Sequence, residues 1–245
     1  MSGERQRPWL SVIIPALNEE ARIAGTVAIV RQCLPEAEVI VVDGGSDDST
    51  PLSAAAAGAS VIESTRGRGL QCHAGAEAAR GEILFFLHAD TLPPTNAGEV
   101  LTRAFARSSV NIGTFRLVFD DHSRFLRACA WLTRFDSVFT RFGDQGIVIR
   151  REFYTRLGGF PPWPLFEDVE LLRRARRITR VWSFPACVTT SARRFRRHGS
   201  VGQQLFNARL LLRFLAGASP EKLAAEYRVE PSAKAARAAT FGPRP

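Results

Sequence analysis

Three groups of polar residues follow apolar stretches of the chain, and their types suit a phosphorylated ligand held through a metal ion. Asn18 and Glu19 follow WLSVIIP, and Asp43 to Ser46 follow EVIVV. His88 and Asp90 follow ILFFL. Carboxylates do not bind phosphate directly, but an Asp with water and phosphate oxygens is a common way to hold Mg²⁺ or Mn²⁺. The pattern favours a nucleotide-type site with a divalent cation, although Asp90 and Thr91 alone would also suit the cap of a following helix.

The elements that place these groups follow from the apolar patterning. Strand-like and helix-like segments alternate in the first half of the chain, and four such units in succession predict an α/β fold with a parallel sheet. Open sheets of this class bind ligands at the edge where their parallel strands end, so all three polar groups are expected there. The predicted strands span residues 9–15, 38–43, 59–64 and 83–90, and a helix opened by Asn18 is predicted after the first strand.

The second half of the chain is less regular. A single domain over residues 1–228 is expected, because no linker separates two parts, and the Ala-, Arg- and Pro-rich residues 229–245 are expected to form a disordered tail. Strands are predicted at 111–120, 145–150, 181–184 and 187–190. Helices are predicted at 123–142, 167–178, 203–215 and 220–227.

Composition limits the class of protein. The 33 Lys and Arg residues outnumber the 24 Asp and Glu residues, and nearly all of the positive charge is arginine, whose planar fork suits phosphate oxygens. The four cysteines form no CxxC pair, which argues against a zinc or disulfide framework and fits a reducing cytoplasm. No apolar run approaches the roughly 20 residues needed to cross a bilayer, so any membrane contact is expected to be peripheral.

Taken in order, several motifs resemble the family 2 glycosyltransferases, whose fold is called GT-A. The resemblance covers about residues 9 to 200 and is specific in the order of its pieces. A further likeness is to a small bacterial subgroup encoded beside radical-SAM and selenium-related genes. The motifs are SVIIPALNEE, VVDGGSDDST, the RGRG loop with AARGE, FLHADT, and GDQGIVIRREFYTRLGGF followed by FEDVEL.

The resemblance implies a role for each matching residue. Asp90 would hold the metal ion, and Asp168 would be the catalytic base with Glu167 as its neighbour. The nucleotide would be contacted by residues of the first three motifs, which are Pro15, Ala16, Asn18, Glu19, Asp43 and Arg68. The family often closes a basic segment over the diphosphate, which would assign that contact to Arg193, Arg194 and Arg197.

Two departures from the family pattern bear on the metal and the nucleotide. The usual Asp-Asp-Gly-Ser is Asp-Gly-Gly-Ser at residues 43–46, so one nucleotide-contacting carboxylate is missing. The first Asp of the metal-binding Asp-x-Asp is His88, and a neutral imidazole ligates Mn²⁺ more readily than Mg²⁺. His88 is therefore a candidate second ligand beside Asp90.

Each of the remaining motifs also has an ordinary structural interpretation. Asp168 and Glu167 could complement the dipole of a helix, and the arginines of SARRFRRHG could form a solvated face. Asp144 and Gln145 are expected near the acceptor, or in a plain turn. The helix predicted at 123–142 carries apolar and arginine faces; such stripes are usually core, but here they could face a membrane and a lipid-linked acceptor.

The sequence thus predicts an inverting glycosyltransferase that moves a sugar from a UDP- or GDP-sugar to a hydroxyl acceptor with the help of Mn²⁺ or Mg²⁺. Two alternatives stay open at this point. A nucleotidyltransferase on a related fold would carry a glycine-rich loop after the first strand, where this chain has PALNEE. A basic adaptor for membranes or nucleic acid would leave the aligned acidic residues unexplained, and no specific nucleic acid is expected as a partner.

Overall fold

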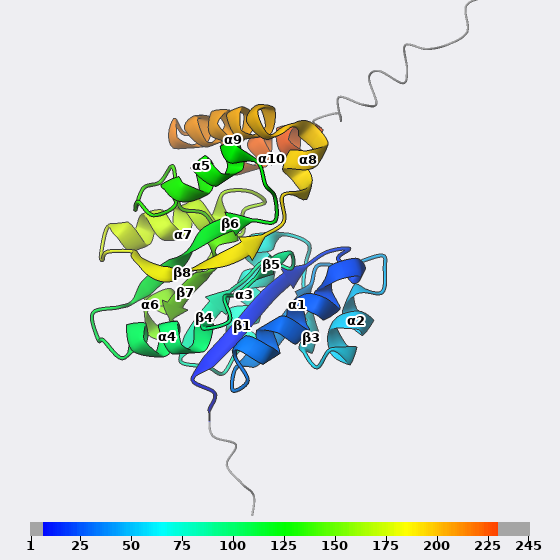
Figure 1. The fold of residues 1–245 in the computed structure, drawn as a ribbon, viewed down its shortest axis with the longest axis vertical. Helices are drawn as coiled ribbons and strands as arrows, with labels where there is room; N and C mark the ends of the chain where they lie inside the picture. Colours follow the sequence, from blue (N-terminus) through cyan, green and yellow to red (C-terminus); the bar gives the residue numbers. More distant parts are fainter. Residues whose placement is uncertain (1–6, 230–245) are drawn as a thin grey trace, which may run out of the picture.

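The structure is a computed structural model that describes residues 7–229, without the side chains of residues 197, 198, 228 and 229. An eight-stranded sheet runs through the middle of the molecule in the order β3-β2-β1-β4-β7-β6-β8-β5 (Figure 1). The strands are β1 (Leu10–Ala16), β2 (Glu38–Asp43), β3 (Ser60–Glu63), β4 (Ile83–Phe86), β5 (Thr91–Leu92), β6 (Ile112–Phe119), β7 (Ile147–Arg150) and β8 (Trp182–Thr190).

The first four major strands are mutually parallel, as the alternating pattern predicted. Strand β7 then runs antiparallel to both of its neighbours, β4 and β6. Strand β8 pairs parallel with β6 and antiparallel with the short β5. The sheet therefore keeps one common edge at the carboxyl ends of β1, β2 and β4.

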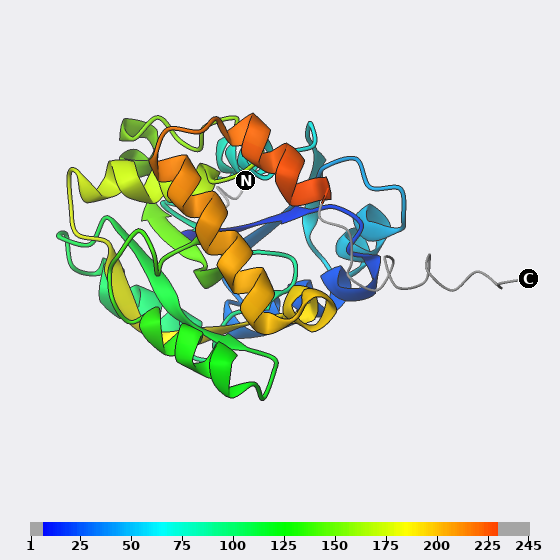
Figure 2. The ribbon, with the colours of Figure 1, turned by 90° about the horizontal axis from the view of Figure 1, so that it is seen from above.

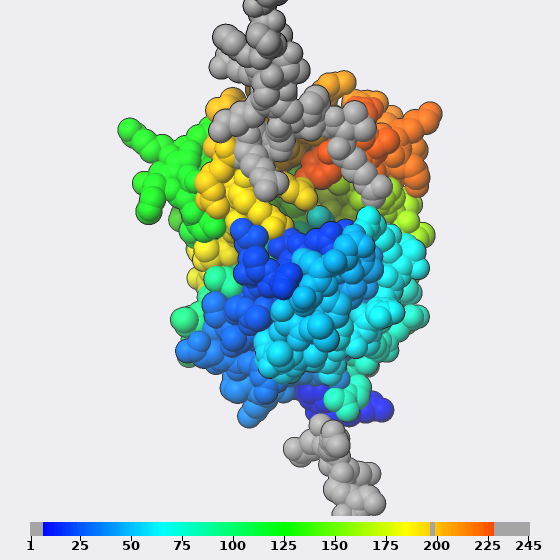
Figure 3. Space-filling model, turned by 90° about the vertical axis from the view of Figure 1, so that its right-hand side faces the viewer, coloured from blue at the N-terminus to red at the C-terminus, as the bar shows by residue number. Residues whose placement is uncertain are grey.

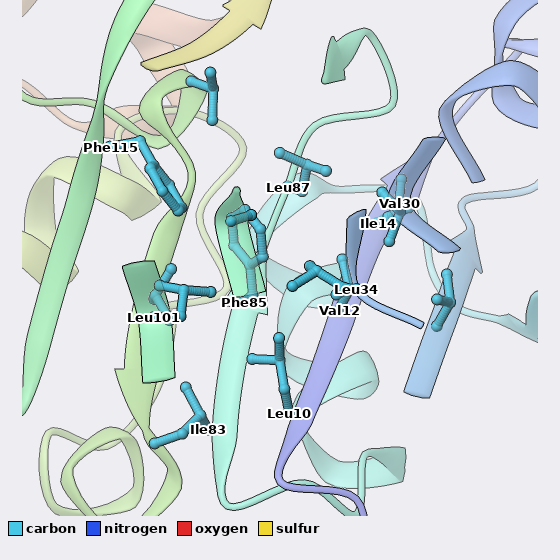
Figure 4. Packing of buried hydrophobic residues seen from close by; sticks show 14 of the residues in the cluster. Leu10, Val12, Ile14, Val30, Leu34, Ile83, Phe85, Leu87, Leu101 and Phe115 are labelled. Atoms are coloured by element: carbon cyan, nitrogen blue, oxygen red, sulfur yellow. The ribbon is translucent and has the colours of Figure 1, made fainter. Parts of the chain in front are cut away.

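Helices cover both faces of the sheet. On one face α1, α2 and α4 bury the alternate side chains of β1 and β2, and Figure 4 shows this cluster around Phe85. On the other face α3, α6 and α7 pack against the opposite side chains of β1, β2 and β4. These helices are α1 (Glu20–Cys33), α2 (Thr50–Ala56), α3 (Arg68–Ala78), α4 (Ala97–Phe105), α6 (Arg151–Arg156) and α7 (Glu167–Arg176).

A second group of helices lies across the upper end of the molecule, where Figure 2 shows α9 beside α5 and α10. The core beneath α9 and α10 is a third cluster, in which Leu210, Leu211 and Phe214 pack with Val169 of α7 and Leu223. This group consists of α5 (Arg124–Leu132), α8 (Arg193–His198), α9 (Ser200–Leu215) and α10 (Pro220–Val229).

Three sequence expectations were wrong in detail. The helix predicted at 123–142 ends at Leu132, and the chain continues through turns to the 3₁₀ turn η1 (Gly143–Gln145). The two short strands predicted between 181 and 190 are one strand, because β8 continues through Pro185 beside β6 with a shift of register. The first helix begins at Glu20 rather than at Asn18, whose positive φ of 54° keeps it outside the helix.

The predicted disordered tail lies almost entirely outside the described residues, and the single-domain boundary at 228 stays a prediction. Within residues 7–229, none of the helices combines the length and the apolar character needed to cross a membrane.

Candidate active site

The predicted polar groups meet at the carboxyl edge of the parallel strands. Pro15 and Ala16 end β1, and Ala16 is in register with Asp43 at the end of β2. His88 follows β4, the neighbour of β1 on its other side. The expectation that these strand ends share one edge is thus confirmed by the topology.

Asp43 organises the turn that follows β2. One of its carboxylate oxygens accepts hydrogen bonds from the backbone N–H groups of Gly45 (3.0 Å) and Ser46 (2.9 Å), and the other accepts from the Ser46 hydroxyl at 2.5 Å. The carboxylate is almost fully buried. Asp43 therefore shapes the turn at this end of the edge and remains a candidate nucleotide contact.

Asn18 links the first loop to this turn. The side-chain amide oxygen of Asn18 accepts the backbone N–H of Asp47 at 2.9 Å, and the backbone N–H of Asn18 donates to the hydroxyl of Ser46 at 2.9 Å. Its left-handed backbone is a conformation that Asn adopts more readily than most residues. The two loops after β1 and β2 therefore form one connected rim.

Gln71 holds the same rim from below, and the sequence analysis did not identify it. Its side-chain amide in α3 donates to the carbonyl oxygens of Ala16 and Val42, each at 2.8 Å. The side chain is buried. The only feature of the sequence that could have indicated this role is a polar residue on the inward face of a predicted helix.

The RGRG loop brings Arg68 next to Glu167. The guanidinium of Arg68 lies 3.6 Å from a carboxylate oxygen of Glu167. Gly69 allows this approach, because a Cβ there would meet the carbonyl oxygen of Pro161 at 2.4 Å and the Cβ of Glu167 at 3.2 Å. The start of α3 therefore packs directly on the loop that leads into α7.

Asp168 is held in a defined orientation at the start of α7. One carboxylate oxygen accepts the backbone N–H of Gly143 at 2.5 Å, and the other accepts the N–H of Val169 at 2.8 Å. A small pocket is lined by Asp168, Arg68, His88 and Glu167 among other residues. His88 thus faces the predicted base.

Asp144 and Gln145 differ in their access to ligands. The Gln145 side chain is completely buried, and its amide donates to the carbonyl oxygen of Thr140 at 2.6 Å. These contacts fix the turn from inside, which favours the plain-turn interpretation for Gln145. Asp144 is partly exposed, and one of its carboxyl oxygens is buried without a partner among the described residues.

The basic segment after β8 reaches the strand edge through Arg193. Its guanidinium donates to both carboxylate oxygens of Glu19 and lies 3.3 Å from a carboxylate oxygen of Asp90. Figure 3 shows this side of the molecule, with α8 in yellow above the blue amino-terminal elements. Arg193 is therefore at the predicted metal carboxylate.

The other arginines of this segment behave differently. Arg194 hydrogen-bonds the Tyr227 hydroxyl and lies over its ring, 5.2 Å from the centroid. Arg196 pairs with Asp120, which follows β6, at 3.1 Å. Arg197 belongs to α8, but its side chain lies outside the described part of the chain.

Comparison with known proteins decides the family. The model of glycosyl transferase family 2 matches residues 11–156, which is more than half of the chain. The chain belongs to glycosyl transferase family 2. Membership of this family favours neither the nucleotidyltransferase nor the adaptor alternative.

Two curated relatives match part of this family 2 chain. Glucosyl-3-phosphoglycerate synthase of Mycolicibacterium paratuberculosis is 30% identical over 42% of the chain and 39% of the synthase. The 4,4'-diaponeurosporenoate glycosyltransferase of Staphylococcus haemolyticus is 35% identical over 40% of the chain and 28% of that enzyme. The matched part thus spans less than half of the length of either relative.

Solved structures confirm the expected GT-A fold. The mannosyltransferase of Pyrobaculum calidifontis in complex with GDP-Man and Mn²⁺ aligns with a TM-score of 0.62 at 23% identity, over 98% of this chain and 78% of that one. Glucosyl-3-phosphoglycerate synthase of Mycobacterium tuberculosis in complex with Mn²⁺, UDP and glucosyl-3-phosphoglycerate aligns with a TM-score of 0.55 at 23% identity. That alignment covers 74% of this chain and 70% of the synthase.

Burial shifts the protonation of three groups in this family 2 site. Burial, reinforced by Arg68 and Arg194, lowers the pKa of His88 well below its usual value, so the imidazole is neutral at pH 7. Burial raises the pKa of Glu167 to about 7, with Arg68 opposing and Asp168 adding to the shift. Burial and the nearby Asp168 raise the pKa of Asp144 to about 7.

The residues fit a divalent cation that shares its coordination with a ligand. Among the described residues, no three His, Cys, Asp or Glu side chains converge to hold a metal by themselves. The Asp90 side chain is 19% exposed and offers one carboxylate at the strand edge. One carboxylate suits Mg²⁺ or Mn²⁺ when phosphate oxygens and water supply the remaining ligands. His88 instead lines the pocket of Asp168.

Proposed function

We propose that this chain is an inverting glycosyltransferase, which transfers a sugar from a nucleoside diphosphate donor to a hydroxyl acceptor with Asp168 as general base. The observation that carries the proposal is the placement of Asp168. The backbone N–H of Gly143 fixes its carboxylate beside Arg68 and His88, in a small pocket that Pro15 at the end of β1 also lines.

The donor is a UDP- or GDP-sugar. Asn18 and Asp43 lie at the edge where β1 and β2 end, and their side-chain oxygens keep lone pairs for a base and ribose. Family membership supports a nucleotide sugar. The solved relatives named above bind UDP and GDP-Man, which supports these two nucleotides over others.

The donor's diphosphate lies between Asp90 and the basic segment. A divalent cation held by Asp90 would offset the negative charge of the diphosphate. Arg193 already lies beside Asp90, and Arg68 is close enough to Asp90 for their charges to interact, so both can donate hydrogen bonds to phosphate oxygens. Positive groups arranged in advance stabilise a leaving diphosphate without reorganisation during the reaction. Arg194 and Arg197 are further candidates on the same helix.

Asp168 removes the proton from the acceptor hydroxyl. Both of its carboxylate oxygens accept backbone N–H groups, which fix their direction and leave lone pairs for an acceptor. The acceptor oxygen then attacks the anomeric carbon as the bond to the diphosphate breaks. One base and one displacement give inversion at that carbon.

The acceptor is a hydroxyl group of a lipid-linked compound, reached at the cytoplasmic face of a membrane. Apolar side chains are exposed on α5 and α9, next to the elements that hold Asp168. Free thiols at Cys33, Cys72, Cys129 and Cys187 are compatible with a reducing compartment.

The test is turnover of nucleotide sugars. The full chain is incubated with Mn²⁺, UDP-glucose or GDP-mannose and a bacterial lipid extract, and release of UDP or GDP is measured. We expect release that depends on the extract and falls by roughly 10²-fold in Asp168→Asn. Glu82→Gln is the matched control, since this exposed carboxylate precedes β4 at the opposite edge of the sheet. Undiminished release by Asp168→Asn would remove Asp168 from the reaction.

A further inference from the structure

An apolar and basic surface lies over the site, formed by the exposed side chains of residues 124–139 and α9. Of eleven large apolar side chains that are strongly exposed in the described residues, eight lie in these two segments. They are Trp131 (50% exposed), Leu132 (46%), Phe135 (53%), Phe139 (56%), Val201 (54%), Leu205 (66%), Leu212 (57%) and Leu215 (38%).

The two segments form one surface. Helix α5 lies beside α9 at the upper end of Figure 1, and Figure 2 shows both on the side facing the viewer. On α9 the exposed apolar residues follow helical spacing from Val201 to Leu215, while Leu210, Leu211 and Phe214 point inward to the core. Helix α9 is therefore apolar on its outer face as well as on its inner one.

The surface is strongly positive. Residues 123–142 and 200–216 contain six arginines and one acidic residue. That residue, Asp136, already pairs with Arg176 at 2.9 Å. Arg124, Arg127, Arg134 and Arg209 are exposed among the apolar side chains. The surface therefore fits a partner that is both apolar and negatively charged.

A groove at the edge of this surface would suit an anionic headgroup. It has a volume of about 260 Å³ and lies between α5 and strands β6 and β8. Arg116, Arg127 and Arg134 line it together with the ring of Trp131. The Nε of Arg116 is buried without a hydrogen-bond partner in the described part of the chain.

We infer that this surface docks the protein onto an anionic lipid bilayer, with the outer side chains of α9 and of residues 131–139 inserted among the acyl chains. Aromatic and aliphatic residues interleaved with arginine are the pattern of helices that lie in a membrane interface. A second copy is a poorer fit, because it would place like charges face to face. The chain's own residues 230–245 contain a single large apolar side chain, Phe241, which is too few to cover the surface.

Docking would bring the acceptor end of the site to the membrane. The inner face of α9 packs on Val169 and Phe166, the residues that flank Glu167 and Asp168. Phe142 belongs to the same cluster and precedes Gly143, which binds Asp168. This orientation rests on the proposed function. It places a lipid surface at the side of the site where the acceptor would enter.

The inference is tested by vesicle binding of the full chain. Phosphatidylcholine vesicles with and without phosphatidylglycerol are sedimented with wild-type protein, with Leu205→Glu/Leu212→Glu and with Arg127→Ala/Arg134→Ala. Wild type should bind vesicles that contain phosphatidylglycerol, and the leucine variant should bind at least ~100-fold more weakly, since each leucine loses the burial of a full side chain. The arginine variant should lose the preference for phosphatidylglycerol.

Matched controls separate this effect from a general loss of apolar or positive surface. Leu52→Glu changes an apolar residue that is 74% exposed on α2, and Arg103→Ala/Arg107→Ala removes two exposed arginines near the end of α4. Both should bind vesicles like wild type. The inference is wrong if the leucine variant binds vesicles as well as Leu52→Glu does. It is also wrong if wild type does not bind vesicles and the leucine substitutions only convert a dimer to monomers.

Measuring donor binding beside vesicle binding separates a failure of this inference from a failure of the proposed function. Thermal shifts with UDP or GDP and Mn²⁺ should be the same in wild type and the leucine variant. Donor binding without vesicle binding would overturn the membrane surface alone. Vesicle binding by a protein that turns over no nucleotide sugar would overturn the proposed function alone.

Discussion

The backbone N–H of Gly143 donates to a carboxylate oxygen of Asp168 at 2.5 Å, although the two residues lie 25 positions apart in the sequence. The GDQG turn therefore has a specific role in the site, which is to orient the proposed base. It presents Asp144 beside that base and buries Gln145 beneath it.

Gly143→Ala should lower kcat by at least ~10-fold with little change in donor affinity. An added Cβ would meet the Asp168 carboxylate at 3.0 Å and the His88 ring at 3.3 Å, so the base must shift. Small displacements of a catalytic group strongly lower the rate of the chemical step. Steady-state kinetics beside donor titration measures the two effects. Gly25→Ala in α1 is the control, because a Cβ there meets nothing within 4 Å. Equal loss of kcat in both variants would show that Gly143 does not orient the base.

Asp144 should make stability depend on pH. Its pKa is about 7 in the folded protein, above that of an unfolded Asp, so the folded state holds a proton that the unfolded state has released. Stability from this group is present at low pH and is lost as pH rises from about 4 to about 7. Asp144→Asn should therefore be the more stable protein at pH 8, by on the order of 1 kcal/mol or a few degrees in Tm.

The same comparison at low pH is the control for this effect. The gain in Tm of Asp144→Asn over wild type should shrink as pH falls and approach zero at about pH 3, where the wild-type carboxyl is mostly protonated in both states. A gain that stays constant from pH 4 to pH 8 would mean that Asp144 ionises normally.

Arg193→Ala should weaken the binding of UDP or GDP by roughly 10-fold or more, because it removes a charge-assisted contact next to Asp90. Arg193→Lys should be intermediate, since it keeps the charge and loses the planar fork that grips Glu19. Arg196→Ala removes the same charge from the same helix and serves as the control, because Arg196 pairs with Asp120 instead. Calorimetric titration would contradict this role if Arg193→Ala and Arg196→Ala bound the nucleotide equally.

Gln71→Met should lower the free energy of unfolding by about 2 kcal/mol, or several degrees in Tm, since it keeps the shape of the side chain but removes two buried hydrogen bonds. Nucleotide affinity should fall as well, because Ala16 and the end of β2 lose a common support. Thermal unfolding with and without UDP measures both. A variant as stable as wild type would show that the rim is held without Gln71.

The sequence predicted those parts of the structure that depend on interactions between residues close together in the chain. Apolar runs closed by polar turns placed β1, β2 and β4 and therefore the edge that carries Asp43 and Asp90. The contacts that complete the site are not local. Gly143 meets Asp168, Gln71 joins two strands, and Arg193 reaches Glu19 across 174 positions.

The wrong expectations have the same origin. Residues 133–142 carry helical spacing of aromatic residues, but Thr133 turns its hydroxyl to the carbonyl oxygen of Ala130 at 2.6 Å, and the chain leaves the helix there. The aromatic side chains at Phe135 and Phe139 are exposed rather than core. Periodicity indicates which residues share a face, but it does not say whether another element covers that face.

The most direct test of the proposed donor site is nucleotide binding that depends on Asp90. Thermal unfolding is followed with UDP and with GDP, each with Mn²⁺ and with a chelator, in wild type and in Asp90→Asn. A ligand at 100 times its Kd stabilises the folded state by about 2.7 kcal/mol, so wild type with Mn²⁺ should melt several degrees higher with one of the two nucleotides. The shift should disappear in Asp90→Asn or in chelator. A wild type that responds to neither nucleotide, or an Asp90→Asn variant that responds as wild type does, would contradict the proposal that a nucleoside diphosphate binds at this edge of the sheet.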